Sequence, residues 1–240
     1  MTGAWSKQRG SHSRLELRLQ QPCDATPAAT GGFSLFFNDQ RSFGTITVSV
    51  ERAELEAKLA SLGPSWLAAP SGADGASDGS LLSLADFLGV VRRQCDPARR
   101  GGAGGHVPVA KFLMDQSKTA GIGNYLLSET LHRAHVWPWA ACADLDEAEW
   151  SALHAAAAEV ICESYESQRA ASRAARAADA DADAVPRTRG AFTFPLLVFR
   201  RDRTDAGLEV RRSLGPHGRS VFWVPELQRR GRPPDVADEP

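Results

Sequence analysis

The segment Gly121-Ile122-Gly123-Asn124 combines residue types that can bind an anion. Its two glycines permit positive φ values and the close approach of another backbone. We expect Asn124 at the start of a helix, where unpaired N–H groups and the helix dipole favour negative charge. A phosphate could be held there without a side-chain cation, although Gly-x-Gly-Asn turns also simply join helices.

A second candidate feature is the charge of the C-terminal region. Residues 186–232 contain eleven arginines and four acidic residues, a local net charge of +7, whereas the whole chain has a net charge of −1. A basic region on a nearly neutral chain is typical of a protein that binds a polyanion. The alternative is a solvated, arginine-rich face without a ligand.

The four cysteines, Cys23, Cys95, Cys142 and Cys162, lie far apart and form no Cys-x-x-Cys pair. This spacing excludes a compact zinc ribbon and argues against a disulfide scaffold. His132 and His135 could be imagined as metal ligands together with Cys142, but we expect no metal site.

The elements that must position these residues change in character along the chain. Apolar and polar residues alternate in the first part, which predicts strands at 12–20, 33–37 and 45–50. Helical spacing and capping residues then predict helices at 83–94, 108–116, 125–134 and 147–168. Strands are expected again at 192–200 and 220–224, around a turn at 215–218. The low-complexity segment 169–185 either extends the last helix or forms a tether.

Composition and linkers set the domain organisation. Hydrophobic residues make up 42% and charged residues 24% of the 240 residues, which is typical of a globular protein, and no apolar stretch is long enough to span a membrane. We expect an α+β fold: a partial antiparallel β-sandwich at 1–80, a helical domain at 81–185, a β-hairpin at 186–228 and a disordered tail at 229–240.

The helix–turn–helix segment has a specific likeness. Phe112-Leu113-Met114-Asp115-Gln116, followed by Gly121 to Ala134, closely resembles the helix–two-turn–helix motif of the formamidopyrimidine-DNA glycosylase and endonuclease VIII family. Met1 to Trp5, Asp39 to Gly44 and Leu62-Gly63-Pro64 resemble other segments of that family in the correct order. The resemblance runs from Met1 to about Leu227.

The resemblance implies roles for individual residues. Gly123 and Asn124 would bind a DNA backbone phosphate, and Met1, Arg41 and Phe43 would fill the gap left by an everted base. Ser42 stands where the family usually has a second arginine.

The C-terminal hairpin resembles the family's finger. Gly218 to Trp223 looks like its hairpin tip, so Arg219 would clamp a phosphate. No cysteine follows Cys162, so a Cys₄ zinc site is impossible there, and the hairpin resembles the zincless finger of eukaryotic and viral members. We therefore expect no cofactor.

The resemblance also implies a reaction. Members of the family are bifunctional DNA glycosylases and AP lyases that excise oxidised bases, using an N-terminal Met-Pro-Glu and a lysine. Neither is found at a matching position, so no catalytic residue is assigned, and we expect the chain to begin within the first domain. It is then either a fragment of an active glycosylase or a catalytically inactive damaged-DNA-binding pseudoenzyme.

A structural nucleic-acid module with a helix–two-turn–helix is the alternative from another class; it predicts neither the Arg-x-Phe strand nor the hairpin arginine. The expected partner is double-stranded DNA containing an oxidised base or an abasic site, with no membrane. We expect an intracellular monomer located in the nucleus or an organelle.

Overall fold

A computed structural model describes residues 3–19, 32–39, 46–67, 81–98, 103–178 and 194–229. The chain divides into two compact units, one formed by Met1–Glu51 with Ser167–Thr193 and the other by Arg52–Glu166 with Phe194–Pro240. The first contains a β-sheet and the second contains helices and a β-hairpin, which confirms the expected α+β class.

The sheet of the first unit has three antiparallel strands in the order β1-β3-β2. They are β1 (Gly3–Ser6), β2 (Ser13–Leu19) and β3 (Phe33–Asp39), so two of the predicted strands are confirmed. Trp5 lies opposite Phe37, with 5.2 Å between the ring centroids, and Leu17 lies opposite Leu35. These cross-strand pairs fix the register of the sheet.

The strand predicted at 45–50 is wrong for its described part, residues 46–50, which form no strand. Val48 and Val50 are 80% and 88% exposed, so their alternation with polar residues does not reflect a half-buried face. A helix that the pattern did not predict follows, α1 (Arg52–Ala60), in which no residue is buried. Its signal is charge spacing, because Arg52 pairs with Glu56 at 2.7 Å one turn later.

The helices of the second unit follow their predicted signals closely. They are α2 (Leu84–Cys95), α3 (Val109–Met114), α4 (Asn124–Arg133) and α5 (Glu147–Ala178), with the short 3₁₀ helix η2 (Cys142–Asp144) before α5. Ser83 caps α2 by accepting the Asp86 N–H at 3.1 Å. Asp146 caps α5 through reciprocal bonds with Glu149 of 2.8 and 2.9 Å.

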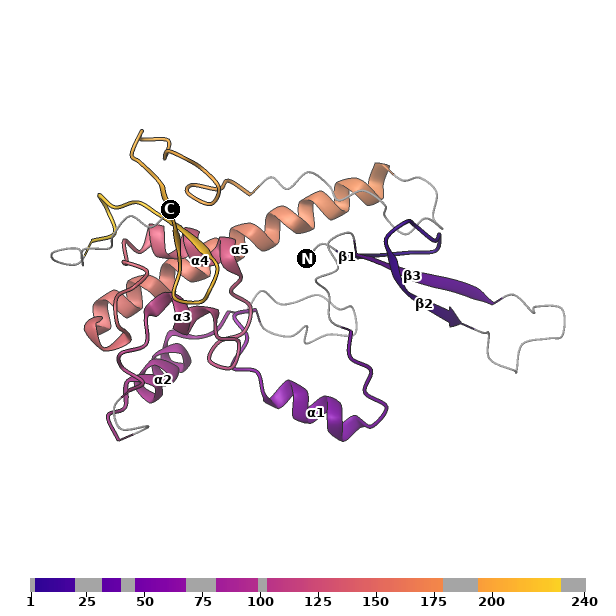
Figure 1. Ribbon diagram of the computed structural model, residues 1–240, viewed down its shortest axis with the longest axis horizontal. Coiled ribbons are helices and arrows are strands. Elements are labelled where there is room, and N and C mark those ends of the chain that lie inside the picture. Colours follow the sequence, from indigo (N-terminus) through magenta and orange to yellow (C-terminus); the bar gives the residue numbers. More distant parts are fainter. Residues whose placement is uncertain are drawn as a thin grey trace. The chain divides into compact units, whose positions relative to one another are not determined.

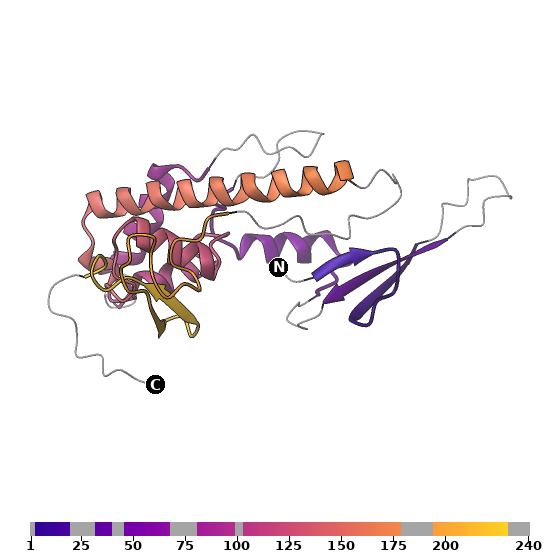
Figure 2. The same cartoon turned by 90° about the horizontal axis from the view of Figure 1, so that it is seen from above.

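Helix α5 shows for part of residues 169–185 whether they extend the helix or form a tether. It continues to Ala178, so this part of the low-complexity segment is helical, as Figure 2 shows, and residues 179–185 lie outside the described ranges. The core of the second unit is aromatic. Phe87 contacts Trp66 and Trp150 with ring-centroid distances of 5.3 and 5.8 Å, and Trp150 also contacts Phe112. This core fixes the helices that carry the candidate site.

The hairpin consists of β4 (Arg211–Leu214) and β5 (Ser220–Trp223), paired antiparallel with Leu214 opposite Ser220. It packs against α4, as Figure 1 shows. The strand predicted at 192–200 is wrong for its described part, because residues 194–200 form loop and turn. The reason is a non-local contact: the N–H groups of residues 197–199 bond to the carboxylate of Glu129 instead of to a neighbouring strand.

Candidate nucleic-acid interface

The turn before α4 is held by Gln116. The side-chain oxygen of Gln116 accepts the Gly121 N–H at 2.9 Å, and its Nε2 donates to the Ile122 carbonyl at 3.0 Å. Gly121 has a φ of +124°, which other residues rarely adopt, and a Cβ there would lie 3.6 Å from Trp66. Glycine and Gln116 together give the turn one conformation.

The beginning of α4 is open. Gly123 is the N-cap residue and makes no side-chain cap, and a Cβ placed on it would meet no atom of the described residues within 4 Å. The first N–H groups of α4 lie beside this residue, at the positive end of the helix dipole. This is the geometry expected of a phosphate site. The contact of Gly123 with a phosphate itself stays a prediction.

The side chain of Asn124 joins this helix end to the hairpin. Its Nδ2 donates to the Ser220 carbonyl at 2.8 Å, across 96 residues of sequence. Its Oδ1 lies 2.9 Å from Nε2 of His217. Because the Ser220 carbonyl can only accept, Nδ2 must face it, and His217 therefore carries its proton on Nε2 and donates to Oδ1.

His217 is a residue that sequence reasoning treated only as part of a turn. Its Nδ1 is buried without a hydrogen-bond partner among the described residues. Burial lowers the pKa of His217, and the nearby charge of Arg219 lowers this pKa further. The sequence signal that could have pointed to His217 is the compact turn Gly215-Pro216-His217-Gly218. The structure shows why this turn needs a glycine, because a Cβ on Gly215 would come within 2.4 Å of the His217 ring.

Arg219 lies exposed at the tip of the hairpin. Its carbonyl accepts the Gly215 N–H at 2.8 Å, and Gly218 has a φ of +77°, which closes the tip. No carboxylate within the described ranges forms an ion pair with Arg219. The structure therefore places Asn124, at the start of α4, in contact with the hairpin tip that carries Arg219, two residues that were predicted separately.

A cavity of about 530 Å³ lies between the start of α4 and the hairpin. Its wall includes Asn124 from α4, Arg212 from β4, Ser220 and Phe222 from β5, and Arg200 from the preceding loop. The wall combines cationic and hydrogen-bonding groups with aromatic rings, a mixture that suits an anionic ligand.

Glu129 fixes the segment that leads into the hairpin. This carboxylate is fully buried and accepts the N–H groups of Leu197, Val198 and Phe199 at 2.9, 3.0 and 2.8 Å. Three charge-assisted bonds to consecutive amides make a strong link between α4 and this loop. Sequence reasoning did not assign this role, because the partners are separated by about 70 residues.

His132, His135 and Cys142, which were considered as metal ligands, do not form a metal site among the described residues. Burial raises the pKa of the Cys142 thiol to about 12, and burial also lowers the pKa of His132. Within the described part of the chain, no group of three or more His, Cys, Asp or Glu side chains is arranged to hold a metal ion. Met1, Arg41 and Phe43 lie outside the described residues, so their gap-filling roles stay predictions.

The chain is similar to known DNA-repair proteins. Residues 92–175 match the family model described as the formamidopyrimidine-DNA glycosylase H2TH domain. Formamidopyrimidine-DNA glycosylase of Cereibacter sphaeroides (strain ATCC 17025) is 33% identical over 204 residues, covering 83% of this chain and 62% of the relative. The Thermus thermophilus protein of the same name is 29% identical over 168 residues, covering 69% of this chain and 50% of the relative. The chain thus spans about three fifths or less of these relatives.

Solved structures show the same fold. A crystal structure of Lactococcus lactis FPG in complex with FAPY-dG-containing DNA has a TM-score of 0.63 at 17% identity, covering 96% of this chain and 72% of that chain. The FPG protein of Thermus thermophilus has a TM-score of 0.61 at 23% identity, covering 97% of this chain and 74% of that chain.

The comparisons correct one expectation. These relatives are bacterial proteins, and bacteria have no nucleus, so the predicted nuclear location is wrong. Among the described helices, none has the length and apolar character needed to cross a membrane.

Proposed function

We propose that the chain belongs to the formamidopyrimidine-DNA glycosylase and endonuclease VIII family and that it holds damaged double-stranded DNA for base-excision repair. The activity of the whole protein would be that of a bifunctional DNA glycosylase and AP lyase acting on oxidised bases. The observation that carries the proposal is the contact of Asn124 with the hairpin tip, directly beside the exposed Arg219.

This arrangement can bind a backbone phosphate with three kinds of donor. Asn124 uses one N–H of its amide on Ser220, which leaves the second for a ligand. The N–H groups at the start of α4 add partial positive charge, and Arg219 adds a full charge with a forked geometry. Contacts of this kind position a duplex without reading its sequence.

The substrate proposal follows the relatives. The Lactococcus lactis protein has been crystallised with FAPY-dG-containing DNA and with abasic-site DNA. For this chain we propose an oxidised base or an abasic site as the ligand. Met1, Arg41 and Phe43 are proposed to fill the space that the everted base leaves.

We also propose that the finger closes without a metal. Its small core is formed by Val198, Val210 and Val224. The fully buried Gln228 accepts the Val224 N–H at 2.7 Å and donates to the Val136 carbonyl at 3.0 Å, which ties the end of the finger to the helical part. These contacts, together with Glu129, support the zincless finger proposal.

A chelator tests the metal-free finger. Dialysis against EDTA should leave the thermal unfolding midpoint and DNA affinity unchanged, because packing and hydrogen bonds hold the finger. Metal content measured before dialysis provides the control. A stoichiometric metal whose removal lowers the midpoint would contradict this proposal.

Binding to a labelled duplex tests the proposed function. Fluorescence anisotropy should show tighter binding to a duplex with a tetrahydrofuran abasic analogue than to the same duplex without it. Equal affinity for both, or no binding, would refute the proposal. Borohydride trapping on a duplex with an oxidised purine measures chemistry separately, since a covalent adduct requires an imine-forming amine.

A further inference from the structure

We propose that Arg200 and Arg212 form a second phosphate-binding element in the cavity beside Asn124, in addition to the hairpin tip at Arg219. The inference rests on the proposed DNA-binding function and extends it to residues for which the sequence predicted no role. It means that the chain holds two points of the DNA backbone around one helix start.

The first observation is the backbone conformation of Arg200. Its φ is +63°, a left-handed value that residues other than glycine, asparagine and aspartate rarely adopt. Such strain persists where the surroundings impose it, and it is concentrated at functional sites. Here the conformation places the guanidinium 5.4 Å from the centroid of the Phe199 ring, and both residues line the cavity.

The second observation is the orientation of Arg212. Its Nε donates to the Ser220 hydroxyl at 3.0 Å, and the Ser220 carbonyl accepts from Asn124. One residue of β5 therefore links Arg212 to the helix start. With Nε engaged, the two terminal nitrogens of the guanidinium remain to bind an anion in the forked manner of arginine.

The third observation is the charge of the cavity wall. Arg200, Arg201 and Arg212 line it together with one carboxylate, Asp202. Arg201 already pairs with Asp205, outside the cavity. Arg200 and Arg212 form no ion pair with any carboxylate of the described ranges, so their charge can be met by a phosphate.

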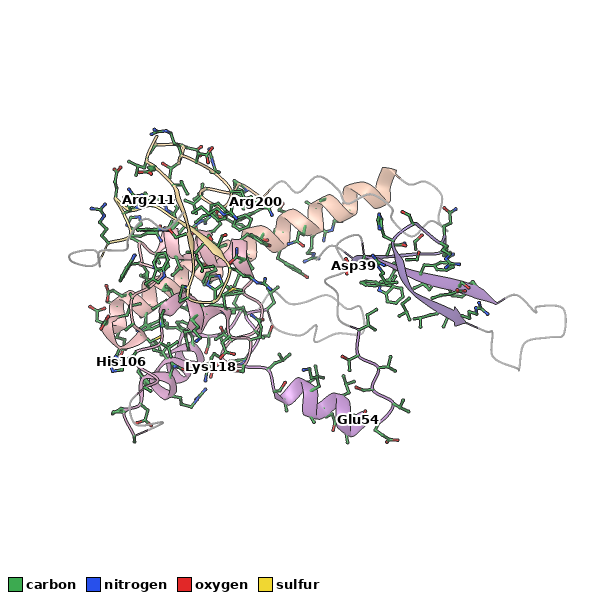
Figure 3. The ribbon with its side chains drawn as sticks, in the orientation of Figure 1. Asp39, Glu54, His106, Lys118, Arg200 and Arg211 are labelled. Atoms are coloured by element: carbon green, nitrogen blue, oxygen red, sulfur yellow. The ribbon has the colours of Figure 1, made fainter. Side chains whose placement is uncertain are left out.

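The chain supplies a matched control on the same strand. Arg211 precedes Arg212, so its side chain points to the opposite face of β4. It pairs with Glu209 at 3.4 Å and does not line the cavity. Figure 3 labels Arg211 and Arg200. Replacing Arg211 removes the same charge from the finger without changing the cavity.

The experiment compares Arg200→Gly, Arg212→Ala and Arg211→Ala with the wild-type chain. Affinity for a duplex containing a tetrahydrofuran abasic analogue is measured at several salt concentrations. Each cavity variant should bind several-fold more weakly, and the slope of log K against log salt should become shallower by about 1. Arg211→Ala should change both quantities much less.

Arg200→Gly carries an internal control for folding. Glycine adopts the left-handed conformation without strain, so this variant should unfold at the same or a higher temperature while it binds DNA more weakly. Cavity variants that match the wild-type affinity and salt slope, or an equal effect of Arg211→Ala, would overturn this inference but leave the proposed function standing. A wild-type chain that binds no duplex would overturn it together with the proposed function.

Discussion

In the proposed function, Arg219 and Asn124 bind the same phosphate in different ways. Asn124 is fixed by two hydrogen bonds to the hairpin tip, whereas the Arg219 side chain is exposed. We predict that Arg219→Ala weakens binding to an abasic-analogue duplex by about 1–3 kcal/mol, because one charge-assisted contact is lost. Anisotropy at low salt measures this, with the exposed Arg203→Ala as a control. An unchanged affinity would show that the tip does not touch DNA.

His217 makes the same site sensitive to pH. Its pKa is lowered in the folded chain, first by burial and then by Arg219, and the pKa of His132 is lowered as well. The unfolded chain then binds protons first as the pH falls below about 6.5, so the contribution of these two histidines to stability is constant above that pH and decreases below it.

We accordingly predict that the thermal unfolding midpoint falls between pH 7 and pH 5.5. His217→Gln, whose amide can still donate to Asn124, should reduce this fall. The same change at His106, which is exposed and makes no such contact, should not. A midpoint that is flat across this range, or equal slopes for all three proteins, would contradict the lowered pKa of His217.

Helix α4 and the segment before the hairpin are joined by Glu129, and this link can be tested with a nearly isosteric change. Glutamine has one acceptor oxygen and turns an N–H₂ group toward amides that need acceptors. We predict that Glu129→Gln lowers the free energy of unfolding by roughly 1.5–3 kcal/mol. Denaturant titration measures the loss. Glu209→Gln, at an exposed carboxylate of the finger, should cost much less.

Elements whose signals are local were predictable from sequence. The caps Ser83 and Asp146 and the glycine turn before Asn124 act within a few residues, and the helices begin where those residues indicate. Residues 46–50 and 194–200 were not predictable in this way. Their conformation depends on whether a distant partner exists, and among the described residues the structure shows one only for the second segment, Glu129.

At the scale of the whole molecule, the candidate site was also predictable only where its signals are local. Sequence identified Asn124 and Arg219 one by one, through their type and local pattern. It could not identify Arg200, Arg212 or His217 as neighbours of Asn124, since that requires the docking of the hairpin on α4. Residue type alone does not separate the arginines of a basic region that face a cavity from those, such as Arg211, that pair with a neighbouring carboxylate.

The distribution of charge over the chain leads to a last prediction. A net charge of −1 gives the molecule no overall attraction to DNA, so binding must come from the basic region at 186–232. Each phosphate contact contributes a slope of about −0.9 to log K against log salt. Two contacts therefore predict that affinity falls about tenfold when salt rises from about 50 to about 200 mM.

Titrations at four salt concentrations, on damaged and undamaged duplexes, measure this slope. Since the contacts are to phosphates, the two slopes should be equal even where the affinities differ. The lesion should change only the intercept of log K against log salt, because it affects the everted base and the residues that fill its place. A slope near zero would mean that the arginines of the finger do not meet the backbone, and steeper binding to damaged DNA would mean that the lesion recruits additional phosphate contacts.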